Sequence, residues 1–374
     1  MPSPAATATT RTVQLLSPEG ELVSSEEAEE YRPIVDALDD ETLTSFYRTM
    51  AVTRAFDVEA ANLQRQGQLA LWVPSLGQEA AQVGSGYAAR AQDHIFPAYR
   101  EHAVALIHGV DPVDIIRLWR GSTTGGWVPG DHGNFHLYTL VIGSQVLHAT
   151  GYAMGVQFDG ASGTGDPESD QAVIAYFGDG AMSQGDVNEA FVFAASYQTP
   201  SVFFLQNNHW AISVPVARQS RTPLVRRGEG FGIPSVQVDG NDVLASYAVT
   251  RRALDEARAG DGPRFIEALT YRMGAHTSSD DPTRYRPPQE MVEWEKKDPI
   301  TRYQTWLRGR GADDAFFDAI TAEGADVAAD VRRRTLSMTS PGSDRIFDAA
   351  YTDPHPVTTA QKQWLADYEA GFEA

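Results

Sequence analysis

The chain has 374 residues, with 30 basic and 50 acidic side chains, a formal net charge of −20 and no cysteine. A chain of this length can bury a sizeable core in one domain or in two packed domains. The acidic balance argues against a nucleic-acid surface and against an anionic membrane as partner, because both need clustered Lys and Arg. The lack of cysteine excludes disulfides, thiol nucleophiles and Cys-ligated metal centres. Neither a long apolar run nor a signal pattern is present, so we expect a cytoplasmic protein.

The first part of the chain reads as a leader. Residues 1–12 are rich in Ala, Thr and Pro, and we expect them to be disordered. Residues 17–41 are dense in Asp and Glu and are typical of a solvated segment. We therefore group residues 1–38 as an N-terminal leader, partly disordered. From Asp39 or Asp40, either of which can cap it, apolar residues at helical spacing predict a long amphipathic helix.

The next part of the chain mixes helices and loops. Asp in the cap position before Pro at the first turn is a favourable helix start. The expected elements, in order, are a helix opening near Gly77-Gln78-Glu79, a strand running into a loop at residues 94–100, a helix from Asp111-Pro112, a loop at 121–133, a helix at 144–158 and a polar loop at 159–170.

The middle of the chain alternates between apolar strands and helices. A near-continuous apolar run is expected of a strand that is covered on both faces. The strands are expected at residues 172–177, 201–205, 235–238 and 265–271, and the helices at 183–197 and 242–259. This repeat predicts an α/β fold with a parallel sheet flanked by helices and right-handed crossovers. We expect an α/β domain over residues 39–300 and a helical C-terminal extension over residues 301–374.

Polar motifs follow two of these strands directly. The first strand runs into Gly178-Asp179-Gly180-Ala181, and the second runs into Gln206-Asn207-Asn208. Ligands of open parallel sheets bind beyond the carboxyl ends of the strands. Asp179 and Asn208 would meet there, and two hard oxygen ligands suit Mg²⁺. The glycines of the first motif let the backbone approach an anion and leave amide N–H groups free to bind it.

One alternative is a metal-dependent nucleotide- or phosphate-binding α/β protein that uses the same carboxylate. The chain lacks a Gly-x-Gly-x-x-Gly loop after a strand and a Walker-type Lys, which disfavours this class. A lone Gly-Asp-Gly is also a common turn. Two polar motifs, each directly after an apolar strand and separated by one crossover, are much more specific than either motif alone.

Further segments in fixed order narrow the interpretation. They are Thr53-Arg54-Ala55-Phe56, Gly77-Gln78-Glu79, Tyr99-Arg100, Gly143-Ser144-Gln145, Trp210-Ala211-Ile212-Ser213, the stretch 271–276, the stretch 280–286 and the stretch 295–299. With the two strand-end motifs, they resemble the thiamine-diphosphate-dependent dehydrogenase (decarboxylating) component of 2-oxo acid dehydrogenase complexes. The likeness is to the alpha subunit of this pyruvate and branched-chain family and covers roughly residues 40–310. It implies a thiamine-diphosphate-binding fold.

The resemblance implies a role for each matching residue. Thiamine diphosphate and Mg²⁺ would be the cofactors. Metal ligands would be Asp179, Asn208 and the carbonyl of Trp210; cofactor contacts would come from Tyr99, Arg100, Leu140, Ile142, Gly178, Gly180, Ala181 and His276; and His276 would be the catalytic residue.

The resemblance also implies the reaction and the partners. A 2-oxo acid would be oxidatively decarboxylated, and its acyl group would pass to the lipoyl domain of an acyltransferase. The glutamate that activates the cofactor would come from a beta subunit, in an α₂β₂ heterotetramer, because no matching segment is present. A non-catalytic scaffold paralogue is a further alternative, but Arg100, Asp179, Asn208 and His276 are all present.

The sequence leaves the substrate open between pyruvate and branched-chain 2-oxo acids. Leu71 and Val73 stand where some relatives place phenylalanine and histidine in the substrate pocket, which favours branched chains. The stretches 280–286 and 295–299 look most like bacterial pyruvate enzymes.

Overall fold

The fold is built on a six-stranded parallel sheet. The computed structural model describes residues 11–122, 126–339, 342, 345–348 and 350–372. The strand order is β1-β7-β8-β4-β3-β2, and every neighbouring pair is parallel. The predicted parallel α/β fold is therefore confirmed. The strands are β1 (Thr12–Val13), β2 (His94–Phe96), β3 (Val173–Gly178), β4 (Ser201–Asn207), β7 (Ser235–Asp239) and β8 (Arg264–Leu269).

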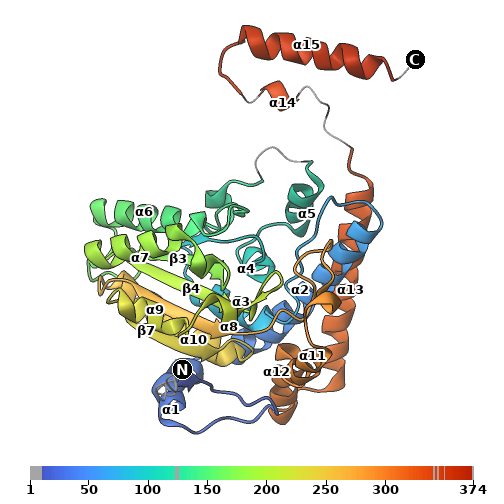
Figure 1. The fold of residues 1–374 in the computed structure, drawn as a ribbon. Coiled ribbons are helices and arrows are strands. Elements are labelled where there is room, and N and C mark those ends of the chain that lie inside the picture. The colour runs from blue at the N-terminus through green and yellow to red at the C-terminus, as the bar shows by residue number, and fades with distance from the viewer. Residues whose placement is uncertain (1–10, 123–125, 340–341, 343–344, 349, 373–374) are drawn as a thin grey trace, which may run out of the picture.

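Helices cover both faces of the sheet, as Figure 1 shows. Alternate residues of a strand point to opposite faces, and in β3 Tyr176 belongs to one core cluster while Phe177 belongs to the other. One face packs against α6 (Ser144–Phe158), α7 (Gly185–Tyr197) and α9 (Val225–Gly230). The other face packs against α10 (Val243–Arg258), which lies along α3 (Glu79–Ala88). These two layers explain why β3 and β4 are apolar along almost their whole length.

Short elements join these layers. They are α4 (His102–Ile107), α5 (Pro112–Arg120), α8 (Val216–Gln219), the antiparallel pair β5 (Trp210–Ala211) and β6 (Val214–Pro215), and the 3₁₀ helices η1 (Pro129–Asp131), η2 (Ala181–Ser183) and η3 (Pro282–Arg284). Among the described residues, no helix is long and apolar enough to cross a membrane.

The N-terminal segment is more ordered than its acidity suggests. Residues 1–10, part of the expected disordered leader, lie outside the described residues. β1 extends the sheet beside β7, and α1 (Glu26–Asp36) packs on α10 with Tyr31 buried. The expectation that residues 17–41 form only a solvated segment was therefore wrong. The segment contains an amphipathic helix whose apolar residues face α10, and its many acidic side chains make this pattern weak in the sequence.

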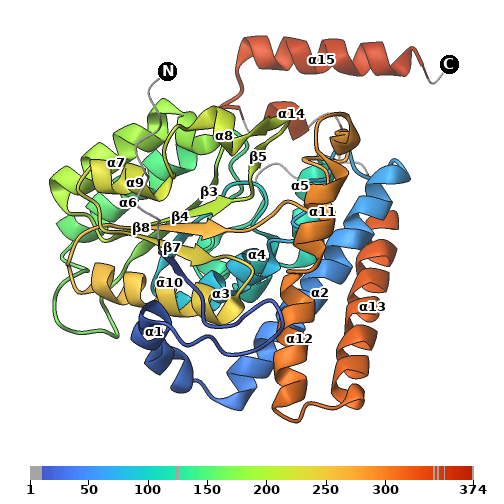
Figure 2. The ribbon, with the colours of Figure 1, turned by 60° about the horizontal axis from the view of Figure 1, so that its bottom comes forward.

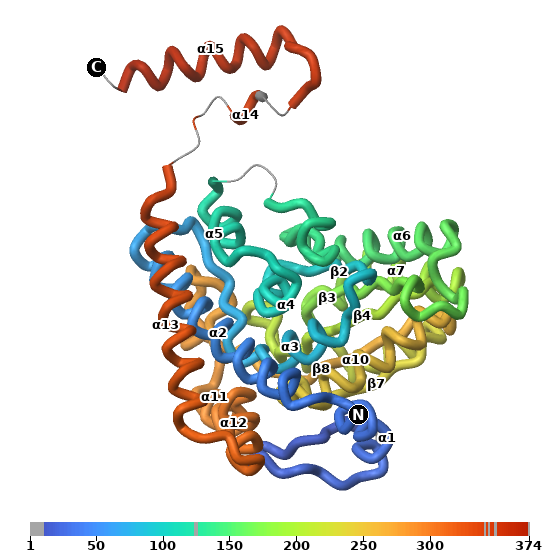
Figure 3. The backbone as a smooth tube through the Cα atoms, turned by 180° about the vertical axis from the view of Figure 1, so that it is seen from behind, coloured from blue at the N-terminus to red at the C-terminus, as the bar shows by residue number. Residues whose placement is uncertain are grey.

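α12 (Pro299–Gly309) and α13 (Asp314–Leu336) pack against α2 (Asp40–Arg65), and Figure 2 shows both beside it. α11 (Pro288–Glu295) precedes them in the chain. α14 (Arg345–Asp348) and α15 (Pro356–Ala370) follow, and α15 stands apart from the sheet and its covering helices in Figure 3. α12 spans the predicted limit at residue 300, and the three-part division of the chain stays a prediction.

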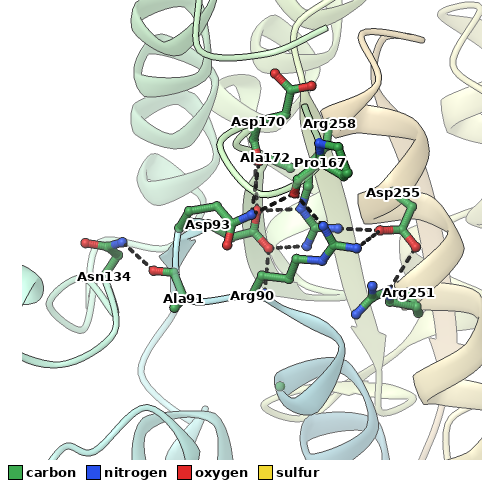
Figure 4. A network of polar contacts seen from close by, with 12 residues as sticks. Arg90, Ala91, Asp93, Asn134, Pro167, Asp170, Ala172, Arg251, Asp255 and Arg258 are labelled. Atoms are coloured by element: carbon green, nitrogen blue, oxygen red, sulfur yellow. Dashed lines mark hydrogen bonds and ion pairs between the residues drawn. The ribbon is translucent and has the colours of Figure 1, made fainter. Parts of the chain in front are cut away.

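A buried ion pair ties the amino ends of two strands to α10, as Figure 4 shows. The Arg258 guanidinium donates to both carboxylate oxygens of Asp93, and both side chains are almost fully buried. The same carboxylate accepts from the backbone N–H groups of Arg90 and Ala172, at 2.7 and 3.0 Å. Asp93 lies just before β2 and Ala172 just before β3, so one carboxylate fixes the starts of both strands.

Candidate active site

A cavity of about 180 Å³ opens at the carboxyl ends of β3 and β4. The two strands end level, because Gly178 pairs with Gln206. Most of the residues predicted for the site line this cavity: Tyr99, Arg100, Ile142, Gly178, Asp179, Gly180, Ala181, Asn208, Trp210 and His276. Leu140 is not among the lining residues and is about half exposed. The sequence motifs thus converge in space, with Leu140 as the exception.

The Gly178-Asp179-Gly180 turn is shaped by its surroundings. A Cβ on Gly180 would lie 2.9 Å from the Cβ of Ala211, so a larger residue would displace the loop that follows β4. Asp179 between the glycines is 2% exposed. Its Oδ2 atom accepts a hydrogen bond from Gln219 Nε2 at 2.7 Å. The turn therefore holds a buried carboxylate at the end of β3.

Oxygen atoms of Asp179 and Trp210 lie on either side of the Asn208 amide. One terminal atom of this amide lies 3.1 Å from the carbonyl oxygen of Trp210 and 3.3 Å from Asp179 Oδ1, and three oxygens meet here in the orientation that places Asn208 Oδ1 at this position. Neighbouring ligands of octahedral Mg²⁺, each about 2.1 Å from the metal, lie about 3 Å apart. The spacing of these oxygens therefore fits two edges of such a shell. Among the described residues no group of three or more His, Cys, Asp or Glu side chains could hold a metal ion, so a metal here would rely on amide and carbonyl oxygens besides the Asp179 carboxylate.

Burial sets the protonation of Asp179. Removal of the carboxylate from water raises the pKa of Asp179 to about 6, although the hydrogen bond from Gln219 opposes this shift. A bound cation would favour the charged form. The group is thus poised to lose its proton when a metal binds.

Arg100 and His276 form one wall of the cavity, and Arg100 carries its positive charge. Nη2 of Arg100 donates to the His276 carbonyl at 3.0 Å, and Nη1 donates to the carbonyl of Pro74. The backbone N–H of His276 donates to Asp280 Oδ2 at 2.8 Å. These bonds fix the Arg100 side chain and the His276 backbone at the cavity wall, where a bound anion would meet the Arg100 charge.

His276 is held neutral and in one tautomer. Burial, together with the charges of Arg100 and Arg272, lowers the pKa of His276 to about 3. Its Nδ1 atom lies 3.3 Å from a guanidinium nitrogen of each arginine. Since guanidinium groups only donate, Nδ1 must accept, and the ring proton resides on Nε2.

Several polar residues beside the cavity were not singled out from the sequence. Arg272 is fully buried and donates to the carbonyls of Trp210 and Ile212, at 3.0 and 2.8 Å. Glu290 on α11 accepts from Trp210 Nε1 and from the Tyr271 hydroxyl. These contacts hold the loop after β4 in place. Arg272 and Tyr271 lie in a motif segment, but only the tertiary structure brings them to Trp210.

The two apolar residues expected in the substrate pocket do not line this cavity. Val73 is buried in the main hydrophobic core, and Leu71 is partly buried and packs against that core. The carbonyl of Val73 accepts a hydrogen bond from buried His102. Their place in the substrate pocket stays a prediction.

The fold and the cavity together define an α/β protein with a polar site at the strand ends, lined by carboxylate and amide side chains and an arginine. The family model for the dehydrogenase E1 component matches residues 47–324. The chain therefore belongs to the dehydrogenase E1 component family, and the resemblance drawn from the sequence motifs is confirmed.

Two named relatives agree with this family. The 3-methyl-2-oxobutanoate dehydrogenase subunit alpha of Mycobacterium tuberculosis (strain ATCC 25618 / H37Rv) is 42% identical over 362 residues, which is 94% of this chain and 93% of the relative. The pyruvate dehydrogenase E1 component subunit alpha of Staphylococcus aureus (strain N315) is 38% identical over 324 residues, which is 86% of this chain and 83% of the relative.

Membership of this family defines the kind of enzyme. It implies an oxidoreductase that acts on a 2-oxo acid, with thiamine diphosphate as cofactor. The relatives are alpha subunits, which implies a beta subunit as partner.

Proposed function

We propose that this chain is the alpha subunit of a branched-chain 2-oxo acid dehydrogenase, with 3-methyl-2-oxobutanoate as a substrate. The relative with that name is more similar and matches more of the chain than the relative named for pyruvate. Together with a beta subunit, the enzyme would decarboxylate the 2-oxo acid oxidatively and pass the acyl group to the lipoyl domain of an acyltransferase. We place this activity in the cytoplasm, which cell fractionation can test.

The observation that supports the binding of Mg²⁺ and thiamine diphosphate is the position of the Asp179, Asn208 and Trp210 oxygens beside Arg100. Asp179, Asn208 and Trp210 would hold Mg²⁺ through Oδ1, Oδ1 and the backbone carbonyl, with the spacing described above. Water and diphosphate oxygens would complete the shell. Arg100 would neutralise part of the diphosphate charge, and the backbone at Gly178, Gly180 and Ala181 would lie against it.

The bound thiamine diphosphate would supply the carbanion-stabilising chemistry that decarboxylation needs. His276 would hold a proton on Nε2, since Nδ1 is occupied by two arginines. A neutral imidazole at the cavity wall can donate a hydrogen bond from Nε2 to developing negative charge and stabilise it there. Tyr99 and Ile142 would line the space beside the cofactor.

The beta subunit would supply the carboxylate that activates the cofactor. Asp179 and Glu101 are the acidic residues that line the cavity in the described part of the chain, and Asp179 is assigned to the metal. The alpha chain would then carry the diphosphate- and metal-binding half of each active site in an α₂β₂ heterotetramer. The non-catalytic scaffold alternative predicts that a calorimetric titration with Mg²⁺ and thiamine diphosphate gives no binding.

Steady-state kinetics of the reconstituted alpha–beta enzyme test the substrate assignment. We expect a higher kcat/KM for 3-methyl-2-oxobutanoate than for pyruvate, with a lipoyl domain as acceptor. A higher kcat/KM for pyruvate would assign the chain to the pyruvate enzymes of the same family.

A further inference from the structure

Gln78 presents a buried amide to the cavity without a full set of partners. It lies just before α3, lines the cavity and is 0% exposed. Its Oε1 atom accepts a hydrogen bond from Asn208 Nδ2 at 3.3 Å, whereas its Nε2 atom is buried without a partner. A buried N–H group without an acceptor is costly. The Gln78 amide therefore indicates one of two things: its N–H group donates to an oxygen of a bound ligand, or the amide adopts a second orientation.

The amide of Asn208 has two orientations, since its oxygen and nitrogen are nearly equal in size. In the first, Oδ1 accepts a hydrogen bond from the Trp210 backbone N–H at 3.3 Å and faces the Trp210 carbonyl and Asp179 Oδ1. Three oxygens then lie close together, and a cation between them would offset their repulsion. In the second, the nitrogen occupies that position and donates to Trp210 O at 3.1 Å and to Asp179 Oδ1 at 3.3 Å. The cation thus decides which orientation is stable.

Gln78 and Asn208 cannot turn independently. When Asn208 turns, its oxygen replaces the nitrogen that faced Gln78 Oε1, and two oxygens oppose each other. If Gln78 turns as well, its Nε2 group donates to the Asn208 oxygen and is no longer an unpartnered donor. Each amide therefore fixes the orientation of the other through their one shared hydrogen bond.

We propose that Gln78 and Asn208 form a coupled amide pair that turns over when the divalent cation binds. In the metal-bound arrangement, Gln78 accepts from Asn208, directs the Asn208 oxygen at the metal and leaves its own N–H for an oxygen of the bound diphosphate. In the metal-free arrangement, both amides are turned. Gln78 is then a positioning residue that couples the metal to the anion, and this inference rests on the magnesium site of the proposed function.

Calorimetric titration of the alpha–beta assembly tests the pair with two variants. Gln78→Leu removes both hydrogen-bonding atoms, and we expect Mg²⁺ to bind about 10–100-fold more weakly. Gln78→Glu can only accept, so it keeps Asn208 in the metal-bound orientation. We expect its Mg²⁺ affinity to be at least that of the wild type, while thiamine diphosphate binds about 10-fold more weakly or worse at saturating Mg²⁺, because a carboxylate repels the diphosphate and offers no N–H.

Gln157→Leu on α6 is the matched control, since Gln157 lies outside the cavity and its amide donates to the carbonyls of Tyr197 and Gln198. Its Mg²⁺ affinity should equal that of the wild type. Thermal melting of each assembly checks folding. If Gln78→Leu does not assemble, the test rests on Gln78→Glu, in which thiamine diphosphate affinity should fall while Mg²⁺ affinity does not. Unchanged Mg²⁺ affinity in Gln78→Leu, or equal losses of both affinities in Gln78→Glu, would overturn the inference. Absence of Mg²⁺ binding by the wild type would instead remove the magnesium site itself.

Discussion

At the scale of single residues, Asp179 shows that a buried carboxylate suited to bind a metal can make the metal-free protein less stable. Its pKa in the folded, metal-free chain is about 6, above the ordinary value of 3.8, because burial disfavours the charge. The carboxyl group therefore stabilises the fold most below about pH 4, and this stabilisation is lost as the pH rises through about 6. At pH 7.5 the metal-free protein holds an uncompensated buried charge, which a cation would offset.

Replacement of the Asp179 charge should raise the stability of the metal-free protein and abolish the binding of Mg²⁺ and thiamine diphosphate. Asp179→Asn should raise the metal-free unfolding free energy at pH 7.5 by about 1–3 kcal/mol, since the amide needs no compensating cation. The same variant should lose the increase in melting temperature that Mg²⁺ and thiamine diphosphate give the wild type. Urea denaturation measures the first effect and thermal melting the second. The exposed Glu189→Gln on α7 serves as the control, and a less stable metal-free Asp179→Asn would contradict this account of the site.

At the scale of elements, the strands that carry the site are the most predictable part of the fold. The apolar runs at 172–177 and 201–205 correspond closely to β3 (Val173–Gly178) and β4 (Ser201–Asn207). Burial on both faces leaves little choice of residue type there, so the pattern is strong. α1 was missed because its acidic side chains outnumber the few apolar residues that face α10.

The ion pair between Asp93 and Arg258 should be important for this sheet. Arg258→Met keeps the apolar stem but leaves the Asp93 carboxylate buried and unpaired, so we expect a loss of about 3–5 kcal/mol in unfolding free energy. Arg251→Met on the same helix removes the partly exposed pair with Asp255 and should cost less than about 1 kcal/mol. Equal losses in the two variants, measured by urea denaturation, would show that burial of the pair is not decisive.

α15 should contribute little to the stability of the rest of the chain. It has no buried residue, although the side chains of Trp364 and Tyr368 stack on each other. A chain that ends at residue 339 should therefore melt at the same temperature as the full chain, within the error of calorimetry. A chain that ends at residue 312 loses the buried Phe317 and Val331 of α13 and should unfold. A clear drop in melting temperature for the chain that ends at residue 339 would reveal packing by the last two helices.

At the scale of the whole molecule, the sequence predicted correctly which residues lie together at the cavity. It predicted less well which hydrogen bonds and orientations these residues adopt. The two strand-end motifs placed Asp179 and Asn208 at one edge because parallel strands end together. The amide orientation of Asn208, its bond to Gln78 and the role of Arg272 depend on side-chain contacts between distant segments. No local pattern reports such contacts. Leu71 and Val73 illustrate the same limit, since apolar residues suit a core and a pocket equally well.

The central claim is that this chain is one half of an active site and holds the metal and the diphosphate. Carbon dioxide release from 3-methyl-2-oxobutanoate, in the presence of Mg²⁺ and thiamine diphosphate, tests it most directly for the alpha chain alone, the beta chain alone and their mixture. We expect release only from the mixture, and loss of that release when the alpha chain carries Asp179→Asn. Turnover by the alpha chain alone, or undiminished turnover by a mixture that contains Asp179→Asn, would contradict the account.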